Sequence, residues 1–195
     1  MEKLKHSVQT TKNYVFERSE LFVGIGVVGG LILIVGVIAL AVHLSGPQIV
    51  YQPVKACDLL TPAKAQDLLG DRVISTDANK PVITDNVATS KCSYTDENPS
   101  EEQMRIAAVA VRSAINDEGD AKNKAEFAQA KKAAGTAGAV SGVGDSAFFN
   151  ATNGQLNVLR GHAWLIANYG FASSPQANTL DDVTKLARDV LSNLK

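Results

Sequence analysis

The chain has 195 residues, of which 45% are hydrophobic and 20% are charged, and its formal net charge is −1. This length allows one ordinary domain with additional segments. The near-neutral charge disfavours a nucleic-acid partner, because the phosphate backbone is bound by a basic face. Aromatic residues make up only 6% of the chain, which also disfavours a platform for stacking bases.

The first element in chain order is an apolar run, since no charged residue occurs between Leu21 and Val42. These 22 residues would form a helix roughly 33 Å long, enough to cross a hydrocarbon core of about 30 Å. A secretory signal has a shorter apolar region, about 7–15 residues. We therefore predict that residues 21–44 form a retained transmembrane helix with the lipid bilayer as its partner. Cleavage after Ala39-Leu40-Ala41, which fits the signal-peptidase pattern, is the alternative.

The flanks of this run predict its orientation. The leader, residues 1–20, carries four basic residues, whereas Lys55 is the only basic residue shortly after the run. The positive-inside rule then places the leader in the cytoplasm and the carboxy-terminal domain outside a single-pass cell membrane protein. Gly26 and Gly30 form a G-x-x-x-G pattern that lets two helices approach closely, so a dimer through this segment is a further alternative.

Residues 45–56 are predicted to be a short tether, and residues 57–195 an extracytoplasmic domain. The two cysteines of the chain, Cys57 and Cys92, both fall in this domain. An even number of cysteines in an oxidising compartment favours a disulfide. A zinc site would need further ligands, and a redox pair would need C-x-x-C. A lipid-modified Cys57 is the main alternative, although Lys55 does not suit a lipobox.

The first half of the domain contains two helix signals around a set of strands. Thr61, Pro62 and Gly70 suit the cap, first turn and end of a helix over 62–70. Strands are expected over 72–95 and over 104–113, where β-branched residues dominate. A helix rich in Ala, Lys and Glu should follow over 116–134, with Phe127 as its apolar anchor.

The second half begins with a glycine-rich loop that runs into a strand. Residues 155–160 and 163–169 are expected to form a hairpin over Gly161-His162, with Trp164 and Ile166 facing the core. Residues 180–194 place apolar side chains at helical spacing and predict an amphipathic helix. This order of elements predicts an α+β domain, with an antiparallel sheet covered by helices on one or both faces.

One stretch suggests a binding loop, V-S-G-V-G-D, with Gly142, Gly144 and Asp145. A phosphate-binding loop follows a strand and opens a helix. Here a predicted helix precedes the loop and a predicted strand follows it, which is the reverse order. The glycines are therefore better interpreted as parts of a tight turn, in which Asp145 bonds to local backbone amides. Ligand contact at this loop is the alternative.

No pattern in the sequence indicates catalysis. There is no G-x-S-x-G or H-E-x-x-H motif, and of the three histidines only His162 would lie in the outer domain, at a hairpin tip. We therefore expect no catalytic residue, metal or cofactor. Asn150-Ala151-Thr152 fits the acceptor pattern for N-glycosylation, which matters only in a host that glycosylates there.

Five segments of the outer domain share a pattern with a known group of proteins. The segments are ACDLLTPAKAQDLLG, CSYT, VSGVGDSAFF, GQLNVLRGHAWLIA and KLARDVLSNL. Together they resemble actinobacterial envelope lipoproteins that share a domain of unknown function. The resemblance implies that Cys57 pairs with Cys92, and it carries no activity. The chain departs from that group at its front, where a predicted membrane helix replaces the usual lipobox.

These observations predict a membrane-anchored binding or interaction domain of the bacterial envelope rather than an enzyme. Its partner would be a protein, an envelope polymer or a small apolar ligand. A hydrolase whose site cannot be recognised from sequence is one alternative. A structural subunit of a membrane complex is the other.

Overall fold

A computed structural model describes residues 49–70, 72–97, 104–135, 138–171, 174 and 177–194. All of them belong to one compact unit, Ile49–Lys195. The predicted leader, the predicted membrane helix with Gly26 and Gly30, and the start of the tether lie outside the described residues. Within these ranges, no helix has both the length and the apolar character needed to cross a membrane.

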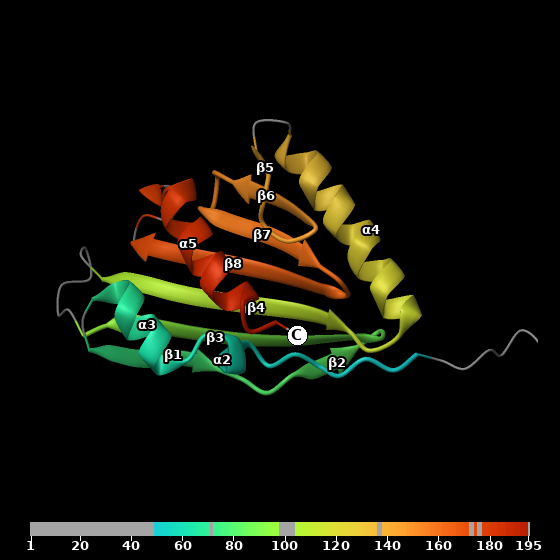
Figure 1. Cartoon of the computed structure of the whole chain (residues 1–195), viewed down its shortest axis with the longest axis horizontal. Helices are drawn as coiled ribbons and strands as arrows, with labels where there is room; N and C mark the ends of the chain where they lie inside the picture. Colours follow the sequence, from blue (N-terminus) through green and yellow to red (C-terminus); the bar gives the residue numbers. More distant parts are fainter. Residues whose placement is uncertain are drawn as a thin grey trace, which may run out of the picture. The chain divides into compact units, whose positions relative to one another are not determined.

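The described residues contain a single antiparallel sheet of eight strands (Figure 1). The order across the sheet is β1-β3-β4-β8-β7-β6-β5, and β2 also pairs with β3. The strands are β1 Val73–Ala78, β2 Val82–Thr84, β3 Val87–Asp96, β4 Arg105–Ala114, β5 Ala139–Val140, β6 Ser146–Asn150, β7 Gln155–Arg160 and β8 Ala163–Phe171. The long strands β3, β4 and β8 lie side by side at the centre of the sheet. This arrangement confirms the predicted α+β class.

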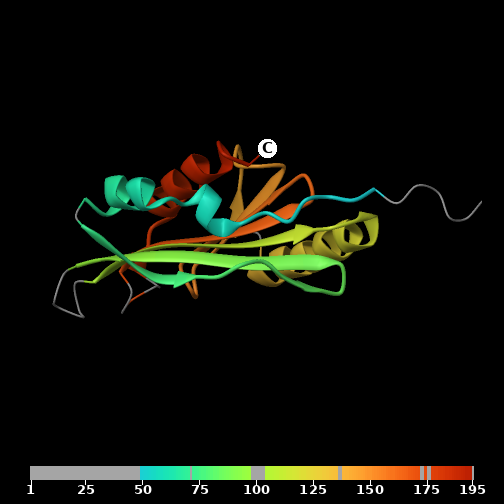
Figure 2. The same ribbon diagram turned by 90° about the horizontal axis from the view of Figure 1, so that it is seen from below.

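Four helices pack on the two faces of the sheet. They are α2 Ala56–Leu59, α3 Pro62–Leu69, α4 Asp117–Ala134 and α5 Leu180–Leu191. Figure 2 shows α2, α3 and α5 together on one side, which we call the α5 face. The opposite side, which we call the α4 face, is contacted by α4 through Phe127. Helices therefore cover both faces of the sheet, the second of the two predicted arrangements.

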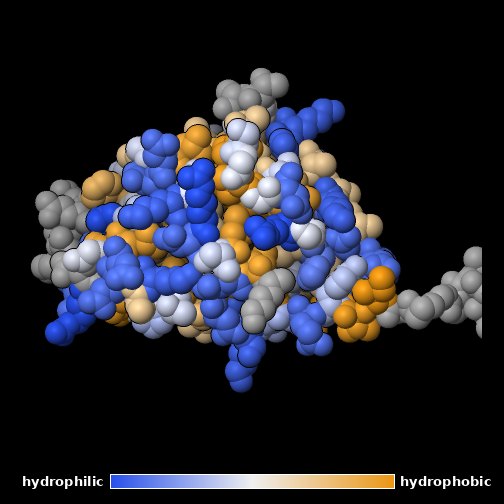
Figure 3. All heavy atoms as spheres, viewed as in Figure 1, coloured by the Kyte–Doolittle hydropathy of each residue, from blue (hydrophilic) through white to orange (hydrophobic). Residues whose placement is uncertain are grey.

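The main hydrophobic core lies between the sheet and the helices of the α5 face. Alternate residues of β4, β7 and β8 point into it, as the two-residue period of a strand requires. Its largest fully buried side chains include Leu60, Val109, Leu156, Leu165 and Leu186. On the outer surface of this face, hydrophilic side chains dominate and apolar ones show between them (Figure 3).

Trp164 and Ile166 do not face this main core. They point to the α4 face, where Trp164 packs with Phe127 and Phe148 in a second, smaller core. Their neighbours Leu165 and Ala167 fill the main core instead. The expectation that Trp164 faces inward is correct, but the sequence did not reveal that β8 is buried on both sides.

A disulfide between Cys57 and Cys92 connects α2 to β3, which confirms the predicted pair. The sulfur atoms are 2.16 Å apart and the Cα atoms are 5.1 Å apart. Cys92 is fully buried in the main core. The bridge therefore holds the start of the domain against the centre of the sheet.

Residues of the predicted tether are bonded to the domain. The backbone N–H of Tyr51 donates to the Ile115 carbonyl at 2.9 Å, and that of Val54 donates to Ser113 Oγ at 3.0 Å. The buried Ser90 hydroxyl in turn donates to the Val54 carbonyl at 2.9 Å. The ordered contacts of the domain thus begin before Cys57.

Candidate functional site

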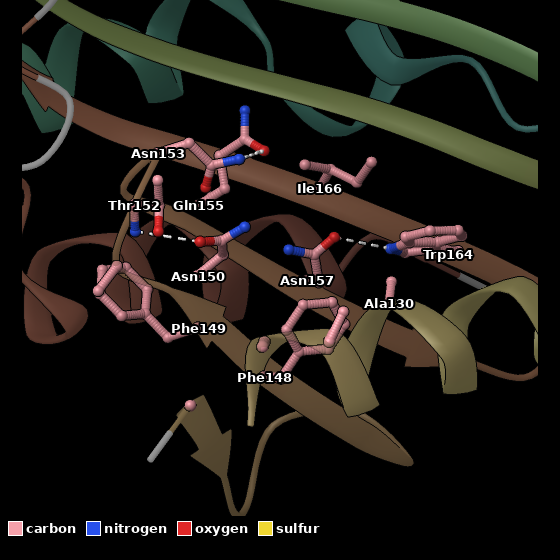
Figure 4. Close-up of a pocket in the computed structure, with 14 residues that line it drawn as sticks. Ala130, Phe148, Phe149, Asn150, Thr152, Asn153, Gln155, Asn157, Trp164 and Ile166 are labelled. Carbon is pink, nitrogen blue, oxygen red and sulfur yellow. Dashed lines mark hydrogen bonds between the residues drawn. The ribbon is translucent and has the colours of Figure 1, made fainter. Parts of the chain in front are cut away.

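A cavity lies on the α4 face, between α4 and strands β6, β7 and β8. Its volume is about 640 Å³. It has a polar wall and an apolar floor (Figure 4). The polar wall consists of Asn150, Thr152, Asn153, Gln155 and Asn157, and the floor includes Ala130, Phe148, Trp164 and Ile166. We call this cavity the amide pocket.

Strand register brings the amides of the wall together. Asn150 at the end of β6 is paired with Gln155 at the start of β7, and Phe148 is paired with Asn157. Positions two apart on one strand share a face, so Asn150 and Asn157 are diagonal neighbours on the α4 face. The short turn between the two strands supplies Thr152 and Asn153.

Hydrogen bonds fix the orientation of Asn157 and Asn150. The Trp164 indole Nε1–H donates to Asn157 Oδ1 at 3.0 Å, and the Thr152 backbone N–H donates to Asn150 Oδ1 at 3.0 Å. Indole and backbone N–H groups can only donate, so each amide must turn its oxygen toward them. The NH₂ group of each asparagine is then directed away from its bonded partner.

The two NH₂ groups point toward one another across the pocket (Figure 4). Neither has a hydrogen-bond partner in the part of the chain that the structure describes. Asn157 is only 6% exposed. Two donors cannot satisfy each other, so this point of the pocket is suited to an acceptor atom.

A second polar group without a hydrogen-bond partner in the described part of the chain lies in the turn between β6 and β7. Asn153 Nδ2 donates to Gln155 Oε1 at 2.9 Å. The other end of this amide, Asn153 Oδ1, is buried without a partner among the described residues. This oxygen is enclosed within the turn, so it is not among the groups that the pocket offers to a ligand.

The floor is held by an aromatic cluster that anchors α4 to the sheet. Phe127 makes edge-to-face contacts with Phe148 at 5.3 Å and with Trp164 at 5.7 Å between ring centroids. The Arg112 guanidinium lies over the Trp164 ring, 4.9 Å from its centroid, and is paired with Glu126. Such contacts add to the stability from burial and hold the rings in place.

Charge is absent from the lining of the amide pocket as far as the described residues show. None of the residues in its wall or floor is an acid, a base or a cysteine. The described residues also contain no group of three or more His, Cys, Asp or Glu side chains that could hold a metal ion. This lining can form hydrogen bonds and apolar contacts, but it offers no group suited to proton transfer near neutral pH.

The predicted binding loop lies elsewhere and packs on the β7–β8 hairpin. Asp145 Oδ2 accepts a hydrogen bond from the Gly161 backbone N–H at 2.6 Å, and the Asp145 N–H donates to the Leu159 carbonyl at 2.8 Å. Gly144 has φ +60°, and a Cβ there would lie 2.6 Å from that same carbonyl. Gly142 also has a positive φ, +73°. Both glycines therefore meet the conformational needs of a turn.

Asp145 also borders a smaller cavity of about 290 Å³ with Arg160 and His162. The His162 ring stacks on the Tyr51 ring, with centroids 4.2 Å apart. Tyr51 donates its hydroxyl to Asp117 at 2.8 Å, and this hydrogen bond raises the pKa of the phenol above its ordinary value. Gly142 and Gly144 do not line either cavity.

The amides of the pocket were not predicted as a site. The sequence singled out Asn150 only as a glycosylation acceptor, and nothing indicated that Asn157 bonds to Trp164. The one available signal was alternation, because Gln155 and Asn157 interrupt the apolar residues of β7 at every second position.

No protein-family model, curated protein or solved structure matches this chain. The resemblance to actinobacterial envelope lipoproteins therefore remains a prediction from the quoted segments.

Proposed function

We propose that this protein is a binding protein of the bacterial envelope, anchored through residues 21–44 with its α+β domain outside the membrane. The amide pocket is the binding site. The observation that carries the proposal is a pair of unpartnered amide donors converging in a cavity of about 640 Å³. Ligand sites are commonly concave and largely apolar, with a few convergent polar groups.

Two further observations support this function. The Cys57–Cys92 bridge suits an oxidising compartment outside the cytoplasm. The described lining of the pocket has hydrogen-bonding groups but no ionisable ones, which suits binding better than hydrolysis.

A structural role in a membrane complex is the second candidate. Ile49 and Val50 are 54% and 73% exposed, and they belong to the predicted tether that follows the span. Exposed apolar side chains beside a membrane are suited to contact with another membrane protein. This role would not require the amide pocket.

Binding can be measured with the only tryptophan of the chain, because Trp164 forms part of the pocket floor. The full-length protein in detergent is titrated with soluble oligosaccharides, short peptides and long-chain alcohols while Trp164 fluorescence is recorded. We expect at least one of these classes to give a saturable change. No saturable response from any class would overturn the binding proposal.

A matched pair of variants locates the binding. Ala130→Phe places a large side chain in the pocket, whereas Ala128→Phe places the same side chain on an exposed position of α4. We expect the first variant to abolish binding and the second to leave it unchanged. Equal binding by both variants would show that the ligand binds outside the amide pocket.

The proposed orientation has a separate test. Protease added to intact cells should degrade the carboxy-terminal domain, with a cytoplasmic protein as the control that stays intact. Degradation only after the envelope is broken would place the domain in the cytoplasm and overturn the envelope assignment.

A further inference from the structure

We propose that the ligand of the amide pocket is a neutral saccharide, one oxygen of which lies between the NH₂ groups of Asn150 and Asn157. This inference rests on the proposed binding function and adds the chemical class of the ligand.

The first argument is the fixed direction of the two donors. Trp164 and the Thr152 backbone each donate to one amide oxygen, so neither asparagine can rotate its amide without losing that hydrogen bond. Both NH₂ groups therefore remain directed into the pocket (Figure 4). A single oxygen with two lone pairs can accept from both at once.

The second argument is the lack of charge. An anionic oxygen would need a cation nearby when it leaves water. Two basic residues adjoin lining residues and are engaged elsewhere: Lys131 Nζ donates to Ser146 Oγ at 2.8 Å, and Arg112 pairs with Glu126. Since no basic side chain is among the described lining residues, the acceptor should be neutral.

The third argument is the mixture of groups that the ligand must satisfy. Besides the two donors, the wall contains the exposed Thr152 hydroxyl, which can donate or accept. A hydroxyl group both donates and accepts, so a ligand with several hydroxyls satisfies this set over a short distance. The C–H faces of a sugar ring would contact the floor formed by Phe148, Trp164 and Ile166.

Other ligand classes fit these groups less well. A purely apolar ligand would leave both amide donors unpaired, which is unfavourable in a site away from water. One mode of peptide binding adds an extended strand to a sheet edge through main-chain hydrogen bonds. The polar groups that we identify in this pocket are side-chain amides on the face of the sheet.

The test compares ligand classes on the full-length protein. The probes are neutral hexose oligosaccharides, uronic acid oligosaccharides of equal length, a neutral tetrapeptide and decanol, with Trp164 fluorescence and calorimetry as readouts. We expect neutral oligosaccharides to bind and the anionic ones to bind at least tenfold more weakly. Binding of the peptide or decanol alone would refute the saccharide and leave the binding function standing. Binding of none would refute both.

Isosteric variants test the position of the oxygen. Asn157→Asp and Asn150→Asp keep the acceptor for Trp164 or Thr152 but replace the NH₂ donor by a second oxygen, so we expect the Kd for the neutral oligosaccharide to rise at least about tenfold. Asn168→Asp is the control. This substitution adds the same charge at the position of β8 that pairs with Gln155. It keeps the oxygen that accepts a hydrogen bond from Asn178, and Asn168 is not among the residues that line the pocket.

The result for these variants is decisive in either direction. Unchanged affinity in both Asn150→Asp and Asn157→Asp would overturn the placement of the oxygen. Weakening by Asn168→Asp to the same extent would show that charge, and not the lost donor, is responsible. Urea unfolding of each variant establishes that it is folded, and Asn150→Asp, on the less buried of the two residues, suffices if Asn157→Asp does not fold.

Discussion

Replacing Gly119 by alanine has two opposing effects on the stability of the protein: it raises helix propensity, and it creates a close contact with the backbone of Asn86. Gly119 lies in the first turn of α4, and an alanine in a helix is more favourable than glycine by up to about 1 kcal/mol. However, a Cβ on Gly119 would lie 2.0 Å from the carbonyl oxygen of Asn86 and 2.9 Å from its carbonyl carbon. Both are backbone atoms, so a side-chain rotation cannot relieve the contact.

Asn86 cannot easily move away, because it connects the β2–β3 turn to α4. Its carbonyl accepts from the Ile115 N–H at 3.0 Å, and its Oδ1 accepts from Asn116 Nδ2 at 3.1 Å. Its own Nδ2 donates to Glu118 Oε2 at 2.9 Å. Displacing this residue would break several of these hydrogen bonds, each worth about 1 kcal/mol.

The clash should outweigh the gain in helix propensity. Inserting a methyl group into a packed site costs about 1–3 kcal/mol, and the loss of one hydrogen bond adds about 1 kcal/mol. After subtracting the propensity gain, we expect Gly119→Ala to lower the free energy of unfolding by about 1–3 kcal/mol.

Urea unfolding of the full-length protein, followed by Trp164 fluorescence, measures this change. Ala125→Gly is the matched control, because Ala125 is exposed in the middle of the same helix. It should lower the free energy of unfolding by about 1 kcal/mol through propensity alone. A Gly119→Ala variant as stable as the parent protein, or more stable, would show that the close approach to Asn86 does not exist.

Two further predictions concern the disulfide and Tyr51. The bridged cysteines are 35 residues apart, so the Cys57→Ala/Cys92→Ala variant should lose about 4 kcal/mol of unfolding free energy, and an unchanged urea midpoint would contradict this. The hydrogen bond to Asp117 raises the pKa of Tyr51 and so favours its neutral form in the folded protein. Its contribution to stability is therefore present below pH of about 10 and is lost as the pH rises through the raised pKa. Asp117→Asn should lower the Tyr51 pKa, as measured by NMR of the tyrosine ring carbons. An identical titration would refute the role of Asp117.

Elements with strong local signals were predicted well. For α3, Thr61 Oγ1 accepts from the Lys64 N–H, and Gly70 ends the helix with φ +79°. The hairpin of β7 and β8 forms over Gly161 and His162 as expected. In these cases a few neighbouring residues determine the structure, so a single sequence contains enough information.

Short elements that depend on distant partners were missed. The strand β5, Ala139–Val140, has only two residues and is defined by pairing with β6. The helix α2, Ala56–Leu59, has four residues, and Ala56 N–H donates to Ser90 Oγ at 3.0 Å. Neither segment has the length or periodicity that identifies an element without its tertiary contacts. The last helix was also predicted too long, because it ends at Leu191 rather than Leu194.

The amide pocket shows why the site itself was not predicted, although the residues that create it were correctly assigned. The alanine-rich composition of residues 116–134 identified α4 as a helix. Yet Ala130, Ala133 and Ala134 line the pocket, and after the anchor at Phe127 these short side chains leave space between helix and sheet. The high helix propensity of this segment comes from alanine, and its small side chain cannot fill the space that the large Phe127 ring creates between α4 and the sheet. The cavity is thus a consequence of the same composition that made the helix easy to recognise.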